Sequence, residues 1–450
     1  MSSISTKPPS GMRDFLPDVI ARRRHVVAVI ERVYASYGFV PLETPSIENL
    51  STLLGKYGEE GDQLLYRILK RRDALTRVLD AGDVDEGGLA DLGLRYDLTV
   101  PLARVVAQYG QLPKFFKRYQ IQPVWRADRP GKGRFREFYQ CDVDITGTTS
   151  LIAEVEVCAA VSQVLTELGF DDFSIALNHR QLLRQLIAAA GIAPHLEETA
   201  LVAIDKLDKI GVDGVLPELA TRGVTEGPAR ALLDLLVRAE GETDAELGDR
   251  LAARIGTDGA RAALDDLRRV LDLASGTPAA GRLRFEPALA RGLGYYTGPI
   301  FEVAVADLAG SLGGGGRYDD LVGMFGKQQI PAVGFSLGLE RILLVLEERG
   351  MYPKLRTGAD VLLCWLGVGE SRVLEVASRL RAQGLRVEVY PEDAKLKKQL
   401  AYADSEGVRV AVAAILGEDE LAAGEITLKH LASGEQARVP IDRAGDFVRR

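Results

Sequence analysis

Cysteine is scarce in this sequence. Three occur in 450 residues, Cys141, Cys158 and Cys364, and they lie far apart without a Cys-x-x-Cys pair. Such spacing argues against a disulfide framework and against a zinc site built on thiolates. We therefore expect a protein of a reducing compartment.

Long apolar runs are absent too. The N-terminal stretch MSSISTKPPSGMRDFLP contains no hydrophobic segment of the kind that a signal peptide needs. No window approaches the roughly 20 apolar residues of a membrane helix. We expect a cytoplasmic protein that does not enter a membrane.

Histidine is also rare. The four histidines, His25, His179, His195 and His430, all lie outside the arginine-, glycine- and tyrosine-rich segments described below. Their absence there counts against a metal-bound hydroxide or a histidine general base. We therefore predict no metal ligands from the protein.

The charge balance is acidic. Lys and Arg number 56 against 64 Asp and Glu, which gives a net charge of −8. An acidic total argues against a nucleic-acid partner, because contact with phosphates needs local positive charge. The field that a ligand meets belongs to a patch, however, and residues 114–136, KFFKRYQIQPVWRADRPGKGRFR, form a basic one.

The length favours two or three domains. Residues 1–184 and 278–350 mix helical with β-rich segments and Gly-rich turns, whereas residues 185–277 are rich in Ala, Leu, Arg and Glu at helical spacing. Residues 360–450 alternate strand-like and helical segments, which is typical of a small α/β domain with a largely parallel sheet. The middle block is either an independent helical domain or an insertion that closes over a substrate, and we favour the insertion.

A basic hairpin is predicted around RADRPGKGRFREF. Strand-like runs lie on both sides of a Gly-bearing turn, so a hairpin would aim Arg126, Asp128 and Arg134 at one ligand while Phe138 offers an aromatic face. Guanidinium groups match phosphate oxygens in pairs, which suits a polyphosphate. The alternative is a solvated basic hairpin without a ligand.

The segment PAVGFSLGLERILLVLEE (331–348) predicts a Gly-rich strand that runs into an amphipathic helix. Arg341 lies in the first turn of this helix, and the alternating glycines allow close approach of backbone or of a flat ring. A nucleotide-facing role is favoured. The alternative for Arg341 is an ion pair with Glu340 or Glu347 on the helix surface.

Tyrosines and one arginine gather near glycines in LARGLGYYTGPIFEVAV (289–305) and SLGGGGRYDDLVG (311–323), where Arg291, Tyr295, Tyr296 and Tyr318 are expected at turns. A neutral imidazole has one donor and one acceptor nitrogen, so hydroxyls together with a carboxylate could bind it. Core tyrosines are the alternative. No βαβ unit surrounds the glycine run, which argues against a Rossmann or P-loop site.

Three segments resemble the motifs of class II aminoacyl-tRNA synthetases in the right order. GFVPLETPSIE (38–48), with Pro45, resembles motif 1; WRADRPGKGRFREF resembles motif 2; and VGFSLGLERI resembles motif 3. RGLGYYTGPIFE and GGGRYDDLVG are similar to the two signature peptides of the histidyl-tRNA synthetase family. PPSGMRDFLP, LRYDLTVPLAR and REFYQCDVDITG are similar to its version in eukaryotes and archaea. The resemblance covers nearly the whole chain.

The resemblance implies an α+β fold. Its core would be the antiparallel β-sheet of the class II synthetases flanked by helices, with a helical insertion and a C-terminal α/β anticodon-binding domain. The implied activity is that of a histidine–tRNA ligase: ATP activates histidine to histidyl-adenylate, and histidine is then transferred to the 3′ end of tRNA(His). ATP would act with Mg²⁺.

The resemblance also implies roles for individual residues. Arg126 would hold the α-phosphate and the histidine carboxylate, and Arg291 would stabilise charge at the α-phosphate; these two are the expected catalytic residues. The ATP-binding set is Arg126, Asp128, Arg134, Phe138 and Arg341, in which Asp128 and Phe138 contact adenine. The histidine-binding set is Asp97, Thr99, Arg126, Gln140, Asp144, Arg291, Tyr295, Tyr296 and Tyr318.

A homodimer is expected as well, because motif 1 of this class forms the subunit interface. The helix at about 19–36 and the strand through Pro45 would then bury apolar area across a two-fold axis. One residue departs from the family pattern: Gly294 replaces the usual Asp beside Tyr295. The runner-up function is a non-catalytic relative, the histidine-sensing regulatory subunit of ATP phosphoribosyltransferase, which typically lacks the C-terminal domain and part of the catalytic set.

Overall fold

The computed structural model describes residues 4–82, 86–291, 294–308, 310–355, 357–405, 408 and 410–449. The chain divides into two compact units, residues 1–353 and 354–450, and each is described here by itself. The division falls inside the 351–359 segment that joins the predicted core to the predicted C-terminal domain.

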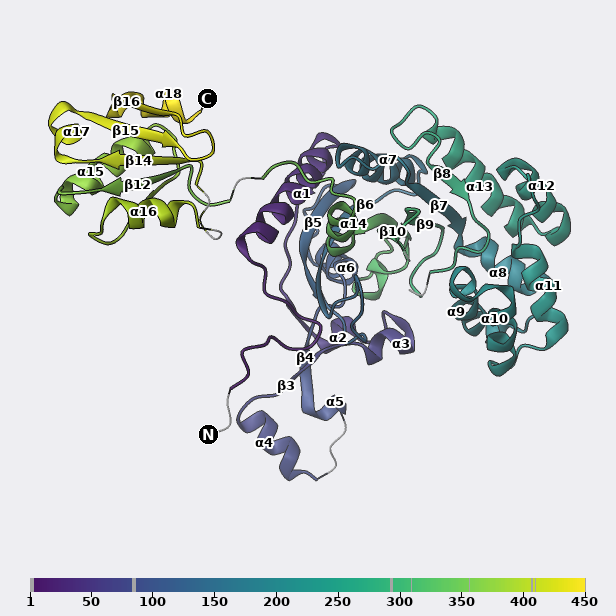
Figure 1. Cartoon of the computed structure of the whole chain (residues 1–450). Coiled ribbons are helices and arrows are strands. Elements are labelled where there is room, and N and C mark those ends of the chain that lie inside the picture. Colours follow the sequence, from purple (N-terminus) through teal and green to yellow (C-terminus); the bar gives the residue numbers. More distant parts are fainter. Residues whose placement is uncertain are drawn as a thin grey trace. The chain divides into compact units, whose positions relative to one another are not determined.

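The first unit is built on an eight-stranded sheet with the strand order β1-β5-β6-β11-β10-β9-β7-β8 (Figure 1). All neighbours run antiparallel except the outer pairs β1/β5 and β7/β8. The predicted antiparallel core is therefore confirmed. The strands are β1 (Val40–Pro41), β5 (Phe116–Trp125), β6 (Glu137–Thr146), β7 (Ser174–His179), β8 (Leu283–Phe285), β9 (Pro299–Ala304), β10 (Gly313–Arg317) and β11 (Ala332–Gly338).

Strands β5 and β6 form the predicted hairpin. Their residues pair from Phe116 with Thr146 to Trp125 with Glu137. Side chains alternate between the two faces of a strand, and on β6 one face carries Cys141, Val143 and Ile145 into the hydrophobic core. The other face carries polar residues, which leaves them for a site.

The glycine run Gly313–Gly316, expected at a turn, is instead strand β10 in the middle of the sheet. A Cβ on Gly315 would lie 1.9 Å from the Gly334 oxygen and 2.7 Å from the Phe335 Cα. Only glycine leaves room for this close approach of backbones. The run is therefore a packing requirement of the sheet.

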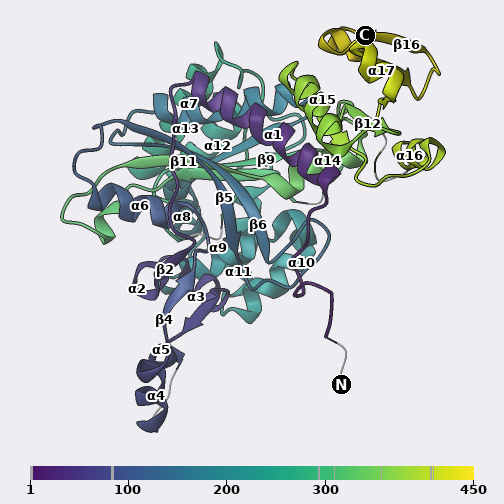
Figure 2. The same cartoon turned by 90° about the vertical axis from the view of Figure 1, so that its left-hand side faces the viewer.

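Helices α1 (Pro17–Ser36), α7 (Ile152–Glu167) and α14 (Leu339–Glu348) pack together with the sheet (Figures 1 and 2). The apolar side chains of α1, among them Val26, Ile30 and Val33, are buried inside the unit. Val19, near the start of the helix, is 39% exposed, and the part of this helix in a subunit interface stays a prediction. The strand after α1 ends at Pro41 rather than running through Pro45.

A smaller sheet, β2-β4-β3, follows α1 in the chain. Together with α6 it precedes the long hairpin, and Figure 2 shows α4 and α5 projecting beyond it. Its elements are β2 (Ile47–Asn49), α2 (Leu50–Leu53), α3 (Gly58–Gln63), β3 (Arg67–Leu69), α4 (Asp73–Asp80), α5 (Glu86–Leu89), β4 (Ala90–Leu94) and α6 (Thr99–Gln108).

A helical block separates β7 from β8, which are parallel neighbours in the main sheet. The block begins and ends beside the same sheet edge, so the chain leaves the sheet and returns to it. Its helices are α8 (Arg180–Ala189), η1 (Pro194–Leu196), α9 (Glu197–Ile204), α10 (Leu207–Thr221), α11 (Glu226–Leu236), α12 (Asp244–Ile255) and α13 (Asp258–Ala274).

The second unit contains the predicted alternation of strands and helices. Strands β13, β12 and β14 are parallel neighbours, and the antiparallel pair β15/β16 extends the sheet. The elements are β12 (Val361–Trp365), α15 (Glu370–Ala382), β13 (Val387–Val389), α16 (Leu396–Ala403), β14 (Val412–Leu416), α17 (Glu418–Ala423), β15 (Glu425–His430), β16 (Gln436–Pro440), η3 (Ile441–Arg443) and α18 (Ala444–Val448). Within the described part of the chain, no helix has both the length and the apolar character to cross a bilayer.

Candidate active site

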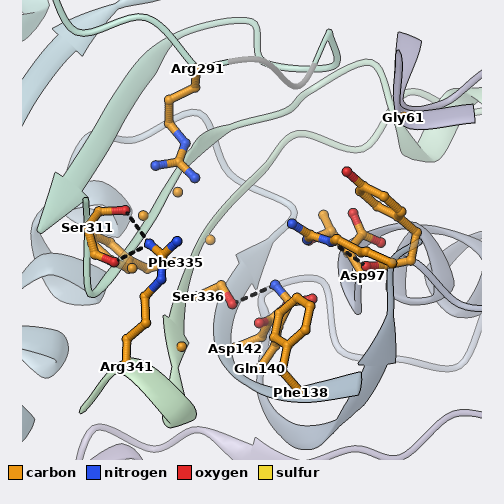
Figure 3. Close-up of a pocket in the computed structure, with 18 of the residues that line it drawn as sticks. Gly61, Asp97, Phe138, Gln140, Asp142, Arg291, Ser311, Phe335, Ser336 and Arg341 are labelled. Carbon is orange, nitrogen blue, oxygen red and sulfur yellow. Dashed lines mark hydrogen bonds between the residues drawn. The ribbon is translucent and has the colours of Figure 1, made fainter. Parts of the chain in front are cut away.

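A cavity of about 400 Å³ lies in the first unit, on the polar face of the main sheet. Strands β6, β10 and β11 form its floor, the 126–136 loop and the start of α14 lie at one end, and α6 with the residues before it lies at the other. Figure 3 shows Arg291, Ser311 and Arg341 on one side and Asp97 with Gln140 on the other. Every residue predicted for the site lines this cavity.

Arg126 begins the loop of the hairpin and lies between two aromatic rings. Its Nε donates to the backbone carbonyl oxygen of Tyr96 at 3.1 Å. Its guanidinium carbon is 4.2 Å from the centre of the Tyr96 ring and 5.2 Å from the centre of the Phe138 ring. Asp128 and Arg134 follow on the same loop, with 3.7 Å between Oδ1 and Nη1. The hairpin therefore brings a planar cation, a carboxylate and an aromatic face to the cavity.

Arg341 points into the cavity from the first turn of α14 and donates to the Ser311 oxygen (Figure 3). The alternative of a surface ion pair is wrong, since Glu340 pairs with Arg23 and Glu347 pairs with Arg22. Burial lowers the pKa of Arg341 from its ordinary value, and the positive charges of Arg134, Arg126 and Arg291 add to this effect while Glu302 opposes it. Such a concentration of cations is suited to an anionic ligand.

Arg291 approaches the same end from the segment before β9. Its Nη1 pairs with Glu302 Oε2 at 2.9 Å and donates to the Phe301 oxygen at 3.3 Å, whereas its buried Nε has no hydrogen-bond partner in the described structure. A Cβ on Gly314 would lie 1.9 Å from Arg291 Nη1. Gly314 thus provides the space in which this guanidinium lies.

Asp97 is the carboxylate at the other end. It is buried, and it accepts from Tyr57 Oη at 3.1 Å, from Val100 N–H at 3.0 Å and from Tyr295 Oη at 3.3 Å. Burial raises its pKa, and these bonds together with Arg126 oppose the rise. Thr99 lines the cavity beside it at the start of α6.

Gln140, Asp142 and Asp144 occupy every second position of β6, so all three face the cavity. Gln140 Nε2 donates to Ser336 Oγ at 2.8 Å (Figure 3), while Gln140 Oε1 and Asp142 Oδ1 are buried acceptors without a hydrogen-bond partner in the described structure. A buried unpaired acceptor is costly. These two oxygens are therefore suited to the N–H groups of a ligand.

Arg118 lies beneath the two aspartates. It is fully buried on β5, with Nη2 at 2.9 Å from Asp144 Oδ2 and 3.6 Å from Asp142 Oδ2. Tyr318 Oη donates to Asp144 Oδ1 at 2.5 Å. Burial raises the pKa of both carboxyls, and Arg118 opposes that rise. One arginine thus faces two carboxyls, which leaves this end of the cavity more acidic than the other.

Tyr295, Tyr296 and Tyr318 are buried and adjacent. The ring centres of Tyr295 and Tyr296 are 4.9 Å apart, and those of Tyr295 and Tyr318 are 6.0 Å apart. Gly294 is exposed next to them, and a Cβ added there would meet no atom of the described residues within 4 Å. Residues 292 and 293 lie outside the described part of the chain.

Several lining residues were not predicted. Asp142 could have been found, because it shares the alternating face of β6 with Gln140 and Asp144. Ser336 occupies an equivalent alternating position on β11. Tyr57, Ser311 and Glu340 had no local signal, since each reaches the site through a contact distant in sequence.

Known proteins are similar to this chain along nearly all of its length. The family model for histidyl-tRNA synthetase matches residues 11–342, and that for an anticodon binding domain matches residues 361–450. The chain is 43% identical to the histidine–tRNA ligase of Gloeobacter violaceus over 97% of each chain, and 42% identical to that of Porphyromonas gingivalis over 97% of each.

Solved structures give the same result. The histidyl-tRNA synthetase of Nostoc sp. PCC 7120 superposes with a TM-score of 0.79 at 30% identity and 100% coverage of both chains. A Bacillus halodurans protein described as an ATP phosphoribosyltransferase regulatory subunit/histidyl-tRNA synthetase has a TM-score of 0.71 at 21% identity and covers 90% of this chain, which shows the fold alone. The fold is that of a class II aminoacyl-tRNA synthetase. Within that class, the chain belongs to the histidyl-tRNA synthetase family.

Proposed function

We propose that this chain is a histidine–tRNA ligase, which activates histidine with ATP and transfers it to the 3′ end of tRNA(His). One observation carries the proposal. A single cavity has Arg134, Arg291 and Arg341 at one end and buried carboxyls with open acceptors at the other, and Arg126 lies near both sets of residues. This distribution fits a polyphosphate placed beside an amino acid with an N–H-bearing side chain.

In the first step a carboxylate oxygen of histidine attacks the α-phosphorus, a new P–O bond forms, and pyrophosphate leaves. Arg126 would hold the α-phosphate and the carboxylate together, and Arg134 and Arg341 would bind the outer phosphates. Asp128 and Phe138 would contact adenine. Arg291 would stabilise the negative charge that develops at phosphorus. Positioning and fixed positive charge supply most of the rate enhancement in such a reaction.

Histidine would lie over β6. Asp97, Gln140 and Asp144 would bind its amino and imidazole groups, and Thr99, Tyr295, Tyr296 and Tyr318 would complete the pocket; all seven line the cavity. In the second step a ribose hydroxyl at the 3′ end of the tRNA attacks the histidyl carbonyl, and AMP leaves. The exposed Lys132 and Arg134 of the 126–136 loop would face the acceptor end.

Mg²⁺ would accompany ATP and neutralise charge on its phosphates. Among the described residues no group of three His, Cys, Asp or Glu side chains could hold a metal ion. Glu340 lines the cavity, but its oxygens already contact Arg23 Nη1 and Tyr139 N–H. This fits an ion held mainly by the phosphates and water, as Mg²⁺ commonly is.

A homodimer is part of the proposal. Strand β1 lies at one edge of the main sheet, and Val40 on it and Ile47 after it are 48% and 42% exposed. An edge strand with exposed apolar side chains is a surface on which a second copy can pair. The interface would therefore use this edge and not the buried apolar side of α1.

We also propose that residues 185–277 form an insertion domain and that residues 360–450 bind the anticodon. The reaction would take place in the cytoplasm, which the three free cysteines fit.

ATP–pyrophosphate exchange with each of the twenty amino acids tests the proposal. We expect exchange with histidine alone. The regulatory-subunit alternative predicts histidine binding without exchange, so the two functions give different results in one assay.

A further inference from the structure

Residues 9–15, which we call the N-terminal segment, lie against the 126–136 loop. The segment makes a tight turn, in which Met12 N–H donates to the Pro9 oxygen at 3.0 Å. Arg136 N–H donates to the Gly11 oxygen at 2.8 Å, and Arg136 Nη1 donates to the Ser10 oxygen at 3.4 Å. The segment is therefore bonded directly to the residue that ends the loop.

Gly11 is required by this contact on two counts. Its φ of +81° lies in the left-handed region that favours glycine. A Cβ at this position would lie 2.7 Å from Arg136 Cγ and 3.0 Å from Pro130 Cγ. Any larger residue would push the segment and the loop apart.

Arg13 makes a second contact with the loop. Its guanidinium carbon lies 3.4 Å from the ring centre of Phe135 and 5.1 Å from that of Phe15. Phe135 lines the cavity. A cation over a ring face is attractive and directional, so Arg13 holds one wall of the cavity from its outer side.

Arg136 connects these contacts to the interior of the loop. Its Nε donates to the backbone carbonyl oxygen of Asp128 at 3.0 Å. At the tip of the loop, Gly131 and Arg134 exchange backbone hydrogen bonds of 3.0 Å. The tip of the loop is exposed: 74% of the Lys132 side chain is accessible, although its Nζ pairs with Glu348 Oε1 at 2.6 Å. An exposed loop has few packing contacts of its own to hold it in a single conformation. Contacts with neighbouring segments therefore determine how well its side chains are placed.

We propose that the N-terminal segment positions the 126–136 loop, with Gly11 and Arg13 as positioning residues that keep Asp128, Arg134 and Phe135 in place at the ATP end of the cavity. This inference rests on the proposed function, because ATP is the ligand of that proposal. Apart from Arg126, the residues assigned to histidine come from other elements. Loss of the segment's contacts should therefore weaken use of ATP more than use of histidine.

Kinetics of ATP–pyrophosphate exchange test this separation. In Arg13→Ala we expect the KM for ATP to rise about five- to tenfold while the KM for histidine changes less than twofold. Arg13→Lys keeps the charge but loses the flat stacking surface, so its KM for ATP should lie between that of wild type and that of Arg13→Ala. Arg24→Ala, at an exposed arginine of α1, is the matched control and should behave like wild type.

Limited trypsin digestion gives a readout that does not depend on catalysis. Arg129 and Lys132 offer cleavage sites in the loop, and we expect cleavage there to be several-fold faster in Arg13→Ala than in Arg24→Ala, as measured by mass spectrometry. Gly11→Ala should change cleavage in the same direction. Circular dichroism of each variant checks that the chain is folded. If Gly11→Ala is not folded, the test is made with Arg13→Ala alone.

The results separate this inference from the proposed function. Unchanged KM for ATP and unchanged cleavage in Arg13→Ala, with normal exchange in wild type, would overturn the positioning role alone. Equal increases in both KM values, together with a lower unfolding temperature, would also overturn it, because they indicate a general structural effect. If wild type exchanged with no amino acid, the proposed function would fail, and the trypsin comparison would still decide the role of the segment.

Discussion

Arg23 and Glu340 form a buried ion pair that connects helix α1 to helix α14. Arg23 Nη1 lies 2.8 Å from Glu340 Oε1, and the two side chains are 7% and 4% exposed. Glu340 Oε2 accepts from Tyr139 N–H at 2.9 Å. One carboxylate therefore joins the helix that precedes motif 1, the second strand of motif 2 and the helix of motif 3, next to the cavity-lining Arg341.

Breaking this pair should destabilise the first unit. Removal of one partner leaves a buried charge uncompensated, which typically costs about 3–5 kcal/mol, so Arg23→Ala should lower the free energy of unfolding by that amount. The same two helices supply a control, because Arg22 and Glu347 form an exposed pair with side chains 38% and 65% accessible. Arg22→Ala should cost less than about 1 kcal/mol. Urea unfolding measures the free energy of unfolding of both variants. Similar decreases in Arg23→Ala and Arg22→Ala would contradict the argument that burial makes the first pair more important.

Arg291 should act on the chemical step. Removal of one preorganised group of this kind typically costs about 2.7–4 kcal/mol, or roughly a hundred- to a thousand-fold in rate. We expect Arg291→Ala to lower kcat for adenylate formation by this factor with a smaller effect on ATP affinity. Arg284→Ala, an exposed arginine on β8, should leave kcat unchanged. Near-normal turnover of Arg291→Ala at saturating histidine and ATP would refute the catalytic assignment.

Gly294 should tolerate the family's aspartate. In the described part of the chain nothing lies within 4 Å of a Cβ built there, and Arg291 already pairs with Glu302 at 2.9 Å. We expect Gly294→Asp to leave the unfolding temperature within about a degree of wild type, since exposed substitutions usually change stability by less than about 0.5 kcal/mol. If the unfolding temperature of Gly294→Asp fell by several degrees in differential scanning calorimetry, the space beside Gly294 would be occupied in the folded protein.

Deletion of residues 360–450 should separate the two steps of the reaction. The described residues that line the cavity belong to the first unit, and the second unit has hydrophobic clusters of its own around Leu363 and Leu362. ATP–pyrophosphate exchange should therefore continue in the shortened chain while transfer of histidine to tRNA falls strongly. Complete loss of exchange in a variant still folded by circular dichroism would contradict this division of roles.

Asp142 should make stability depend on pH. Burial raises the pKa of this carboxyl to about 7, with Arg118 opposing the rise, whereas an unfolded aspartate titrates near 3.9. Between these values the folded protein binds more protons than the unfolded protein, so the free energy of unfolding falls as the pH rises. Asp142→Asn removes this contribution and should gain stability relative to wild type from pH 5 to pH 7.5. A constant difference between the two proteins across that range, in urea unfolding, would show that Asp142 does not titrate there.

The sequence by itself determined the elements whose pattern is local. The 116–146 hairpin, the strand that runs into the Arg341 helix and the alternation after residue 360 each have a periodicity that follows from side-chain direction within one element. Because the arginines and predicted tyrosines lie within such elements or beside them, part of the set of residues that lines the cavity could be predicted.

Only the tertiary structure decided which groups meet. Arg23 and Glu340 are 317 residues apart, and Arg341 bonds to Ser311 instead of its neighbour on the helix. Gly315 belongs to a strand because the backbone of Gly334 and Phe335 approaches it closely. No property of the glycine run 313–316 indicates this approach. Contacts of this kind depend on the packing of distant elements against one another. A pattern with a period of two or 3.6 residues gives the face on which a side chain lies, but not the partner that the fold brings to that face.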